Sequence, residues 1–139
     1  MNEFEAMQAR HSVRSFTDEP IDAQTRDALT QAIEQGNAEG NLHMRLVCDD
    51  PKAFDSALAH YGKFSGVRNY VVLAGPDNDT LEERCGYYGE RVALRAQELG
   101  LNSCWVALTF KRRYVRKMVA PGDKLVVVIA LGHGTFAWT

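Results

Sequence analysis

Apolar side chains follow two patterns along this chain, a recurrence every three or four residues and short uninterrupted runs. The first pattern predicts helices with one buried face, at residues 2–9, 23–35, 80–100 and 111–119, and from Pro51 for about ten residues. The second pattern fits strands that are buried on both faces, at residues 42–48, 70–74, 104–108 and 125–131. Because helices alternate with short apolar strands without a linker or a repeat, we expect one α/β or α+β domain over residues 1–139.

Glycines mark positions where these helices should end or meet a neighbour. Gly36 and Asn37 are expected to end the helix over 23–35, because both residues tolerate the left-handed backbone of a helix end. Gly86 and Gly89 lie inside the helix over 80–100, where each costs about 1 kcal/mol relative to alanine. We therefore predict that another element approaches the backbone of this helix closely at these glycines. The helix from Pro51 should bury Phe54, Ala57, Leu58 and Tyr61.

The composition narrows the classes of partner. The net charge is -2, whereas a general nucleic-acid binder carries a large basic excess, so we expect no nucleic-acid partner. No apolar run approaches the roughly 20 residues that span a bilayer, so we expect no membrane partner. The first ten residues carry acidic side chains and no apolar core, unlike a secretory signal. These features predict a cytoplasmic protein.

Cysteine and histidine spacing gives no sign of a disulfide framework or a metal site. Cys48, Cys85 and Cys104 are widely separated, form no Cys-x-x-Cys pair and are odd in number, which also fits a reducing compartment. We expect buried, inert thiols. The histidines share no zinc-ligand spacing; they are His11, His43, His60 and His133.

Two basic segments are candidates for binding an anion. RHSVRSF places Arg10, His11, Ser12 and Arg14 directly after the first predicted helix, and guanidinium and hydroxyl groups together suit a phosphate or carboxylate. From the spacing alone, a solvated basic turn is the more frequent explanation of such a segment. The second segment, KRRYVRK over residues 111–117, could be a solvated helix face, a nucleic-acid contact with Tyr114 stacking on a base, or an attractor for the phosphate of a nicotinamide cofactor.

Several motifs, taken in order, resemble the FMN-dependent nitroreductase family, and in particular its small, compact branch. They are the R-x-S-x-R of RHSVR, GKFSGV over 62–67, YYGERVALRAQELGLNSCWVALTF over 87–110 and IALGHG over 129–134. The resemblance runs along nearly the whole chain. It implies an α+β sandwich, in which a central, mostly antiparallel sheet carries helices on both faces.

The resemblance also implies a cofactor site for FMN. In it Arg10, His11 and Ser12 would hold the phosphate and ribityl chain, and Arg14 would reach the N1–C2 carbonyl edge of the flavin. A guanidinium there would stabilise the negative charge of reduced flavin. One backbone amide of the strand after LGLNS would point at flavin N5; that strand comprises Trp105, Val106, Ala107 and Leu108. Asn41 and His43 would complete the pocket from the partner subunit of a homodimer.

The implied activity is oxidoreduction with NADH or NADPH as hydride donor and an electron-poor acceptor such as a nitroaromatic or a quinone. The flavin would carry the chemistry, so no side chain is expected to act as a nucleophile or a general base. The alternative is a non-catalytic flavin- or nucleotide-binding protein on the same fold. Turnover with reduced nicotinamide would distinguish the two, because a binding protein keeps its flavin oxidised.

The sequence departs from the family pattern in two places. The loop that reads N-x-Q-P-W in many relatives is here 41–45, NLHMR, so substrate selection cannot be transferred. Relatives also continue past the last core strand with a basic H-K-x-K-like segment that holds the FMN phosphate, and this sequence ends at Thr139 before it. We therefore expect a weaker hold on the phosphate, by one or two charge-assisted bonds of roughly 1.5–3 kcal/mol each.

Overall fold

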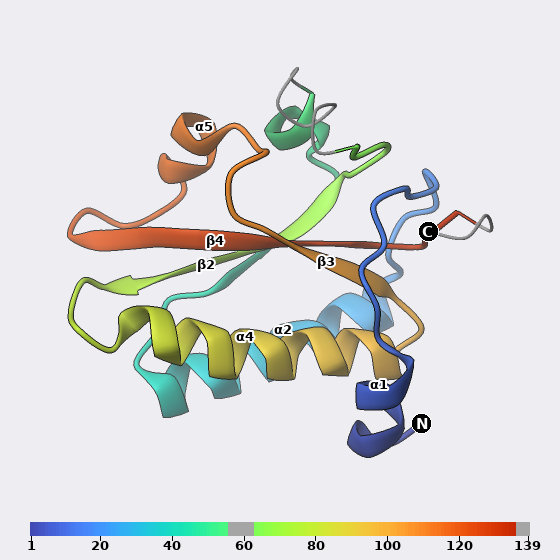
Figure 1. Cartoon of the computed structure of the whole chain (residues 1–139), viewed down its shortest axis with the longest axis horizontal. Coiled ribbons are helices and arrows are strands. Elements are labelled where there is room, and N and C mark those ends of the chain that lie inside the picture. The colour runs from blue at the N-terminus through green and yellow to red at the C-terminus, as the bar shows by residue number, and fades with distance from the viewer. Residues whose placement is uncertain (56–62, 136–139) are drawn as a thin grey trace.

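A computed structural model of the chain, which describes residues 1–55 and 63–135, contains one four-stranded sheet between two helical layers (Figure 1). The strands follow the order β1-β2-β4-β3, and every neighbouring pair is antiparallel. Their bounds are Arg45–Val47 for β1, Asn69–Pro76 for β2, Asn102–Val106 for β3 and Asp123–Gly132 for β4. The prediction of an α+β sandwich with helices on both faces of an antiparallel sheet is confirmed.

The two central strands, β2 and β4, form the longest ladder of the sheet. It runs from Asn69 opposite Leu131 to Pro76 opposite Asp123, with one irregularity between Leu73 and Ala74. Side chains alternate between the two faces, and helical or loop segments cover both, which is why these strands read as uninterrupted apolar runs in the sequence.

Helices α2 and α4 cover one face of the sheet, and α1 packs against α4 (Figure 1). The bounds of α1, α2 and α4 are Glu3–Ala9, Ala23–Gly40 and Leu81–Glu98. The predicted end of the second helix at Gly36 and Asn37 is wrong, because α2 continues to Gly40 and ends at Asn41, whose φ is 50°. Gly36 instead allows a close approach: an added Cβ would lie 2.9 Å from the Met44 methyl carbon.

The prediction of a close approach to α4 holds at one glycine and fails at the other. A Cβ on Gly89 would lie 2.5 Å from Cδ2 of Leu73 and 2.7 Å from the Trp105 ring. At Gly86 nothing lies within 4 Å of that position, and the residue is exposed. Gly89 is therefore required by packing, whereas Gly86 faces away from the sheet.

The opposite face of the sheet is covered by a 3₁₀ helix, η1, over Pro51–Phe54 and by α5 over Arg112–Arg116. A helix of about ten residues from Pro51 was predicted; η1 has four residues, and Ala57, Leu58 and Tyr61 lie outside the described residues. Asp50 joins this layer to the sheet, because its carboxylate accepts hydrogen bonds from Tyr70 at 2.8 Å and from Tyr114 at 3.0 Å.

Two edge strands are shorter or shifted relative to the prediction. Of residues 42–48 only Arg45–Val47 pair in β1, because the side chain of Asn37 bonds both backbone groups of Met44 and holds the chain in a loop. The strand predicted over 104–108 begins at Asn102 and ends at Val106, which leaves two of the predicted strand residues beyond its end. Among the described residues no helix combines the length and the apolar character needed to cross a membrane.

Candidate functional site

The basic segment after α1 lies along the open edge of β3. Ser12 forms a parallel bridge with Ser103, and the Val13 amide donates to the Ser103 carbonyl oxygen at 3.0 Å. Further along, the amide of Ser65 donates to the Arg14 carbonyl oxygen at 2.9 Å. The segment is therefore held along the edge of β3 by its backbone.

Arg10 forms an ion pair with a carboxylate of the protein itself, that of Glu90. Its Nε lies 3.3 Å from Oε2 of Glu90 on α4, and its Nη1 donates to Oγ of Ser103 at 3.2 Å. The other carboxylate oxygen of Glu90 accepts from the indole nitrogen of Trp105 at 3.0 Å. Glu90 thus joins α4, β3 and the segment after α1, and sequence reasoning did not identify it. The only sign of its role in the sequence is its position next to Gly89, where a close approach to the helix is predicted.

The other three residues of the segment present their side chains to solvent. His11, Ser12 and Arg14 are all exposed. The His11 ring lies 3.1 Å, at Nδ1, from the Ala9 carbonyl oxygen. Arg14 forms no ion pair with another residue of 1–55 or 63–135. One guanidinium, one imidazole and one hydroxyl are therefore available beside the β3 edge.

The strand β3 offers one backbone amide at this edge. The Ser103 carbonyl points away from β4, since it accepts from Val13, so residues two apart from Ser103 also direct their backbone groups outward. The Trp105 N–H is such a group, and no described backbone group outside the sheet pairs with it. Val106 points into the core at 2% exposure, whereas Ala107 and Leu108 follow the strand and are exposed.

Asn41 and His43 lie far from this edge. The His43 amide donates to Ala74 on β2 at 2.8 Å, and its Nδ1 lies 2.7 Å from Oδ2 of Asp123, the first residue of β4. Ser103 pairs with Leu131 near the other end of that strand. Eight residues of antiparallel strand separate these ends by roughly 27 Å. One copy of the chain does not bring the two groups together.

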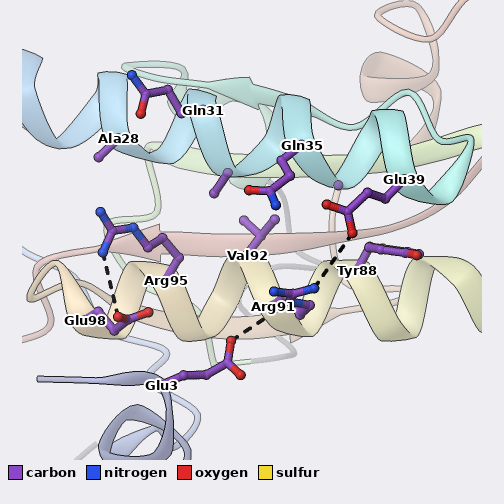
Figure 2. Close-up of a pocket in the computed structure, with 12 residues that line it drawn as sticks. Glu3, Ala28, Gln31, Gln35, Glu39, Tyr88, Arg91, Val92, Arg95 and Glu98 are labelled. Atoms are coloured by element: carbon purple, nitrogen blue, oxygen red, sulfur yellow. Dashed lines mark ion pairs between the residues drawn. The ribbon is translucent and has the colours of Figure 1, made fainter.

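The outer groove between α2 and α4 is a separate feature (Figure 2). It encloses about 350 Å³ and contains none of the predicted site residues. Arg91 lies 3.9 Å from Glu3 and 4.0 Å from Glu39 across it, and Arg95 lies 3.7 Å from Glu98. These exposed pairs satisfy each other's charge, so the groove offers no unpaired ionic group for chemistry. Within the described part of the chain no three His, Cys, Asp or Glu side chains cluster as metal ligands would.

Comparison with known protein families decides which fold family this geometry represents. The family described as "Putative TM nitroreductase" matches residues 2–137. The chain belongs to the nitroreductase family. No curated protein sequence matches it.

Solved structures of other nitroreductases share the fold over most of their length. An FMN-dependent nitroreductase from Clostridium difficile R20291 superposes with a TM-score of 0.77 at 18% identity, over 98% of this chain and 90% of that one. A nitroreductase with bound FMN from Bacteroides fragilis gives 0.74 at 21% identity, over 100% and 91%. A nitroreductase in complex with FMN from Desulfovibrio desulfuricans gives 0.72 at 17%, over 97% and 87%.

Two thiols of this nitroreductase-family chain, Cys48 and Cys85, are poor nucleophiles. All three cysteines are free, and Cys85 and Cys104 are buried. Burial raises the pKa of Cys85 to about 11 and also raises the pKa of Cys48, which is partly exposed. At neutral pH these two thiols are therefore protonated, as expected for residues with a packing role.

Proposed function

We propose that this nitroreductase-family chain is an FMN-dependent oxidoreductase that uses NADH or NADPH as hydride donor. Its acceptor would be an electron-poor small molecule, such as a nitroaromatic or a quinone. The observation that carries the proposal is the pairing of exposed donors on the segment after α1 with an open strand edge whose Trp105 amide points outward. Family membership and the FMN named for two of the solved relatives support it.

The donors of this edge suit a phosphorylated flavin in their chemistry. Ser12 and His11 would bind the phosphate and ribityl oxygens, and Arg14 would face the pyrimidine edge of the ring, where a fixed positive charge favours the reduced form. The outward amide of Trp105 would donate toward N5. The bound flavin supplies the hydride chemistry, and the protein supplies position and charge.

Arg10 would bind the phosphate only in competition with its internal partner. Glu90 already occupies the Nε side of the guanidinium, and Ser103 occupies one terminal nitrogen. The second terminal nitrogen has no partner among the described residues, so Arg10 can offer one further donor. Glu90 would therefore reduce the contribution of Arg10 to phosphate binding.

We also propose that the functional unit is a homodimer. Asn41 and His43 lie at the end of β4 remote from Ser12, so they could reach a flavin only on a second copy of the chain. The Asp123 carboxylate would hold the His43 ring in place, because its Oδ2 lies 2.7 Å from Nδ1, and 59% of the His43 side chain remains exposed.

The test is the visible spectrum of the protein after purification with FMN and desalting. Retained flavin absorption that bleaches under anaerobic NADH or NADPH supports the oxidoreductase. Retained flavin that neither nicotinamide bleaches, although dithionite does, identifies a flavin-binding protein instead. Loss of flavin in Arg14→Gln but not in Arg26→Gln, an exposed arginine on α2, would assign the effect to the β3 edge.

A further inference from the structure

A second cationic site lies beyond the end of β3, next to α5. It is an open pocket of about 540 Å³. Leu108, Phe110 and Tyr114 supply its apolar and aromatic lining, and four cations of the segment 111–117 supply its charge. That segment carries five of the chain's 16 Lys and Arg residues and no acid, although the chain as a whole has a net charge of -2.

Two of the four cations already have partners. Lys111 forms an ion pair with Asp55 at 2.5 Å. Arg112 lies over the Phe110 ring at 5.7 Å. Its guanidinium also donates to the backbone carbonyl oxygens of Ala107, Leu125 and Val126, at 3.2, 2.6 and 3.0 Å. Both side chains therefore build the wall of the pocket and fix the loop after β3.

The other two cations, Arg113 and Lys117, are exposed and form no ion pair with any described residue. They are four positions apart, which brings their side chains to the same side of the α5 turn, about 5–6 Å apart at Cβ. Like charges at this spacing repel each other, so their placement lowers stability unless an anion lies between them. A phosphate monoester, with nearly two negative charges, matches that arrangement.

The aromatic floor of the pocket suits a flat base beside that phosphate. Tyr114 lines the pocket, and its hydroxyl donates to the Asp50 carboxylate at 3.0 Å, so the ring has a fixed orientation. Leu108 is 77% exposed at the rim. An adenine ring that stacked on Tyr114 would bury both apolar surfaces and bring a substituent of its own ribose toward Arg113 and Lys117.

We propose that this pocket binds the adenosine 2′-phosphate of NADPH and makes NADPH the preferred hydride donor. The proposal rests on the proposed function, which leaves the choice of nicotinamide open. The position agrees with it, because Leu108 follows Trp105 by three residues, which span at most about 10 Å, and the Trp105 amide is the candidate donor to the flavin. A nucleotide held at α5 would therefore lie beside the proposed flavin edge.

The first experiment measures nucleotide binding without any flavin turnover. Adenosine 2′,5′-bisphosphate and 5′-AMP are titrated by calorimetry into the protein as purified. The bisphosphate should bind about tenfold or more tightly than 5′-AMP, and the difference should shrink as salt rises. Arg113→Gln and Lys117→Gln should each remove most of the difference. Arg116→Gln, which removes one charge from the same helix outside the pocket lining, should preserve it.

The second experiment compares KM for NADPH and NADH in the flavin-loaded protein. The wild type should prefer NADPH, and Arg113→Gln/Lys117→Gln should raise KM for NADPH about tenfold or more without changing KM for NADH. Equal use of both nicotinamides, together with equal binding of the two adenosine phosphates, overturns the proposal but leaves the flavin function intact. Binding of a single-stranded oligonucleotide through Arg113 and Lys117, without the bisphosphate preference, also overturns it. Failure to retain FMN rejects the proposed function, and the calorimetry still decides the pocket.

Discussion

The two glycines of α4 should respond in opposite directions to the same substitution. Gly86→Ala places a methyl group in open space, so only the helix propensity changes, and we expect a gain of about 0.5–1 kcal/mol in the free energy of unfolding. Gly89→Ala gains the same propensity but places its Cβ 2.5 Å from Leu73 and 2.7 Å from the Trp105 ring. Real Cβ atoms do not tolerate such distances, so one neighbour must move.

The cost of that movement can be worked out from the surrounding contacts. Overpacking a core by one methyl group typically costs 1–3 kcal/mol. The Trp105 ring cannot move away freely, because its indole nitrogen donates to Glu90 at 3.0 Å, and losing that bond would add about 0.5–1.5 kcal/mol. After subtraction of the propensity gain, Gly89→Ala should destabilise the protein by about 0.5–4 kcal/mol.

Urea unfolding followed by circular dichroism at fixed protein and FMN concentration measures both changes. In a separate thermal unfolding experiment, Tm should shift by about 3–5 °C per kcal/mol for a chain of this size. The two variants differ from the wild type by the same methyl group on the same helix, so Gly86→Ala is the matched control. A Gly89→Ala variant as stable as the wild type would show that Trp105 does not pack against α4 as described.

Three further substitutions or titrations test other parts of the structure. Glu90→Gln removes the charge that competes with the phosphate for Arg10. The affinity for FMN should therefore rise about three- to tenfold, while the affinity for riboflavin, which has no phosphate, stays constant. Glu98→Gln is the control, and an equal gain in affinity for both flavins would contradict the competition. Cys85, whose pKa is raised to about 11 by burial, should resist a thiol reagent at pH 8 until urea unfolds the protein; rapid native labelling would exclude burial. Hydrogen bonds to Asp50 and burial raise the pKa of two tyrosines in the folded state, so their stabilising effect is present below pH 10 and is lost as pH rises further. Asp50→Asn should therefore flatten the fall in unfolding free energy above pH 10, with tyrosine ionisation followed at 295 nm; an unchanged slope would refute the assignment.

The elements with the strongest local patterns could be predicted from the sequence. The strands β2 and β4 read as uninterrupted apolar runs because both faces of the sheet are covered, and α4 kept its helical spacing throughout. The end of α2 could not be predicted, because Gly36 serves a close contact with Met44 rather than a helix end. A glycine in the sequence is compatible with both roles, and only the neighbouring element distinguishes them.

Part of the candidate site could also be predicted from the sequence, and part of it could not. The motif RHSVRSF identified a segment of donors, and the prediction that these residues and the strand after LGLNS serve one site stays a prediction that the flavin experiments will test. The structure added that Ser12 and Ser103 are paired on one strand edge. It also separated Asn41 and His43 from that edge by most of the length of β4.

Hydrophobic spacing by itself determined that helices alternate with buried strands in one domain, because it dictates which face of each element must leave water. The choice of an α+β sandwich came from the resemblance to nitroreductases. Only the tertiary structure determined the partners of individual charges. Arg10 and Glu90 are 80 positions apart, and no local pattern links them, yet they lie 3.3 Å apart because α4 packs beside the edge of β3. Electrostatic pairing depends on distance in space, whereas burial of an element depends mainly on its own residues.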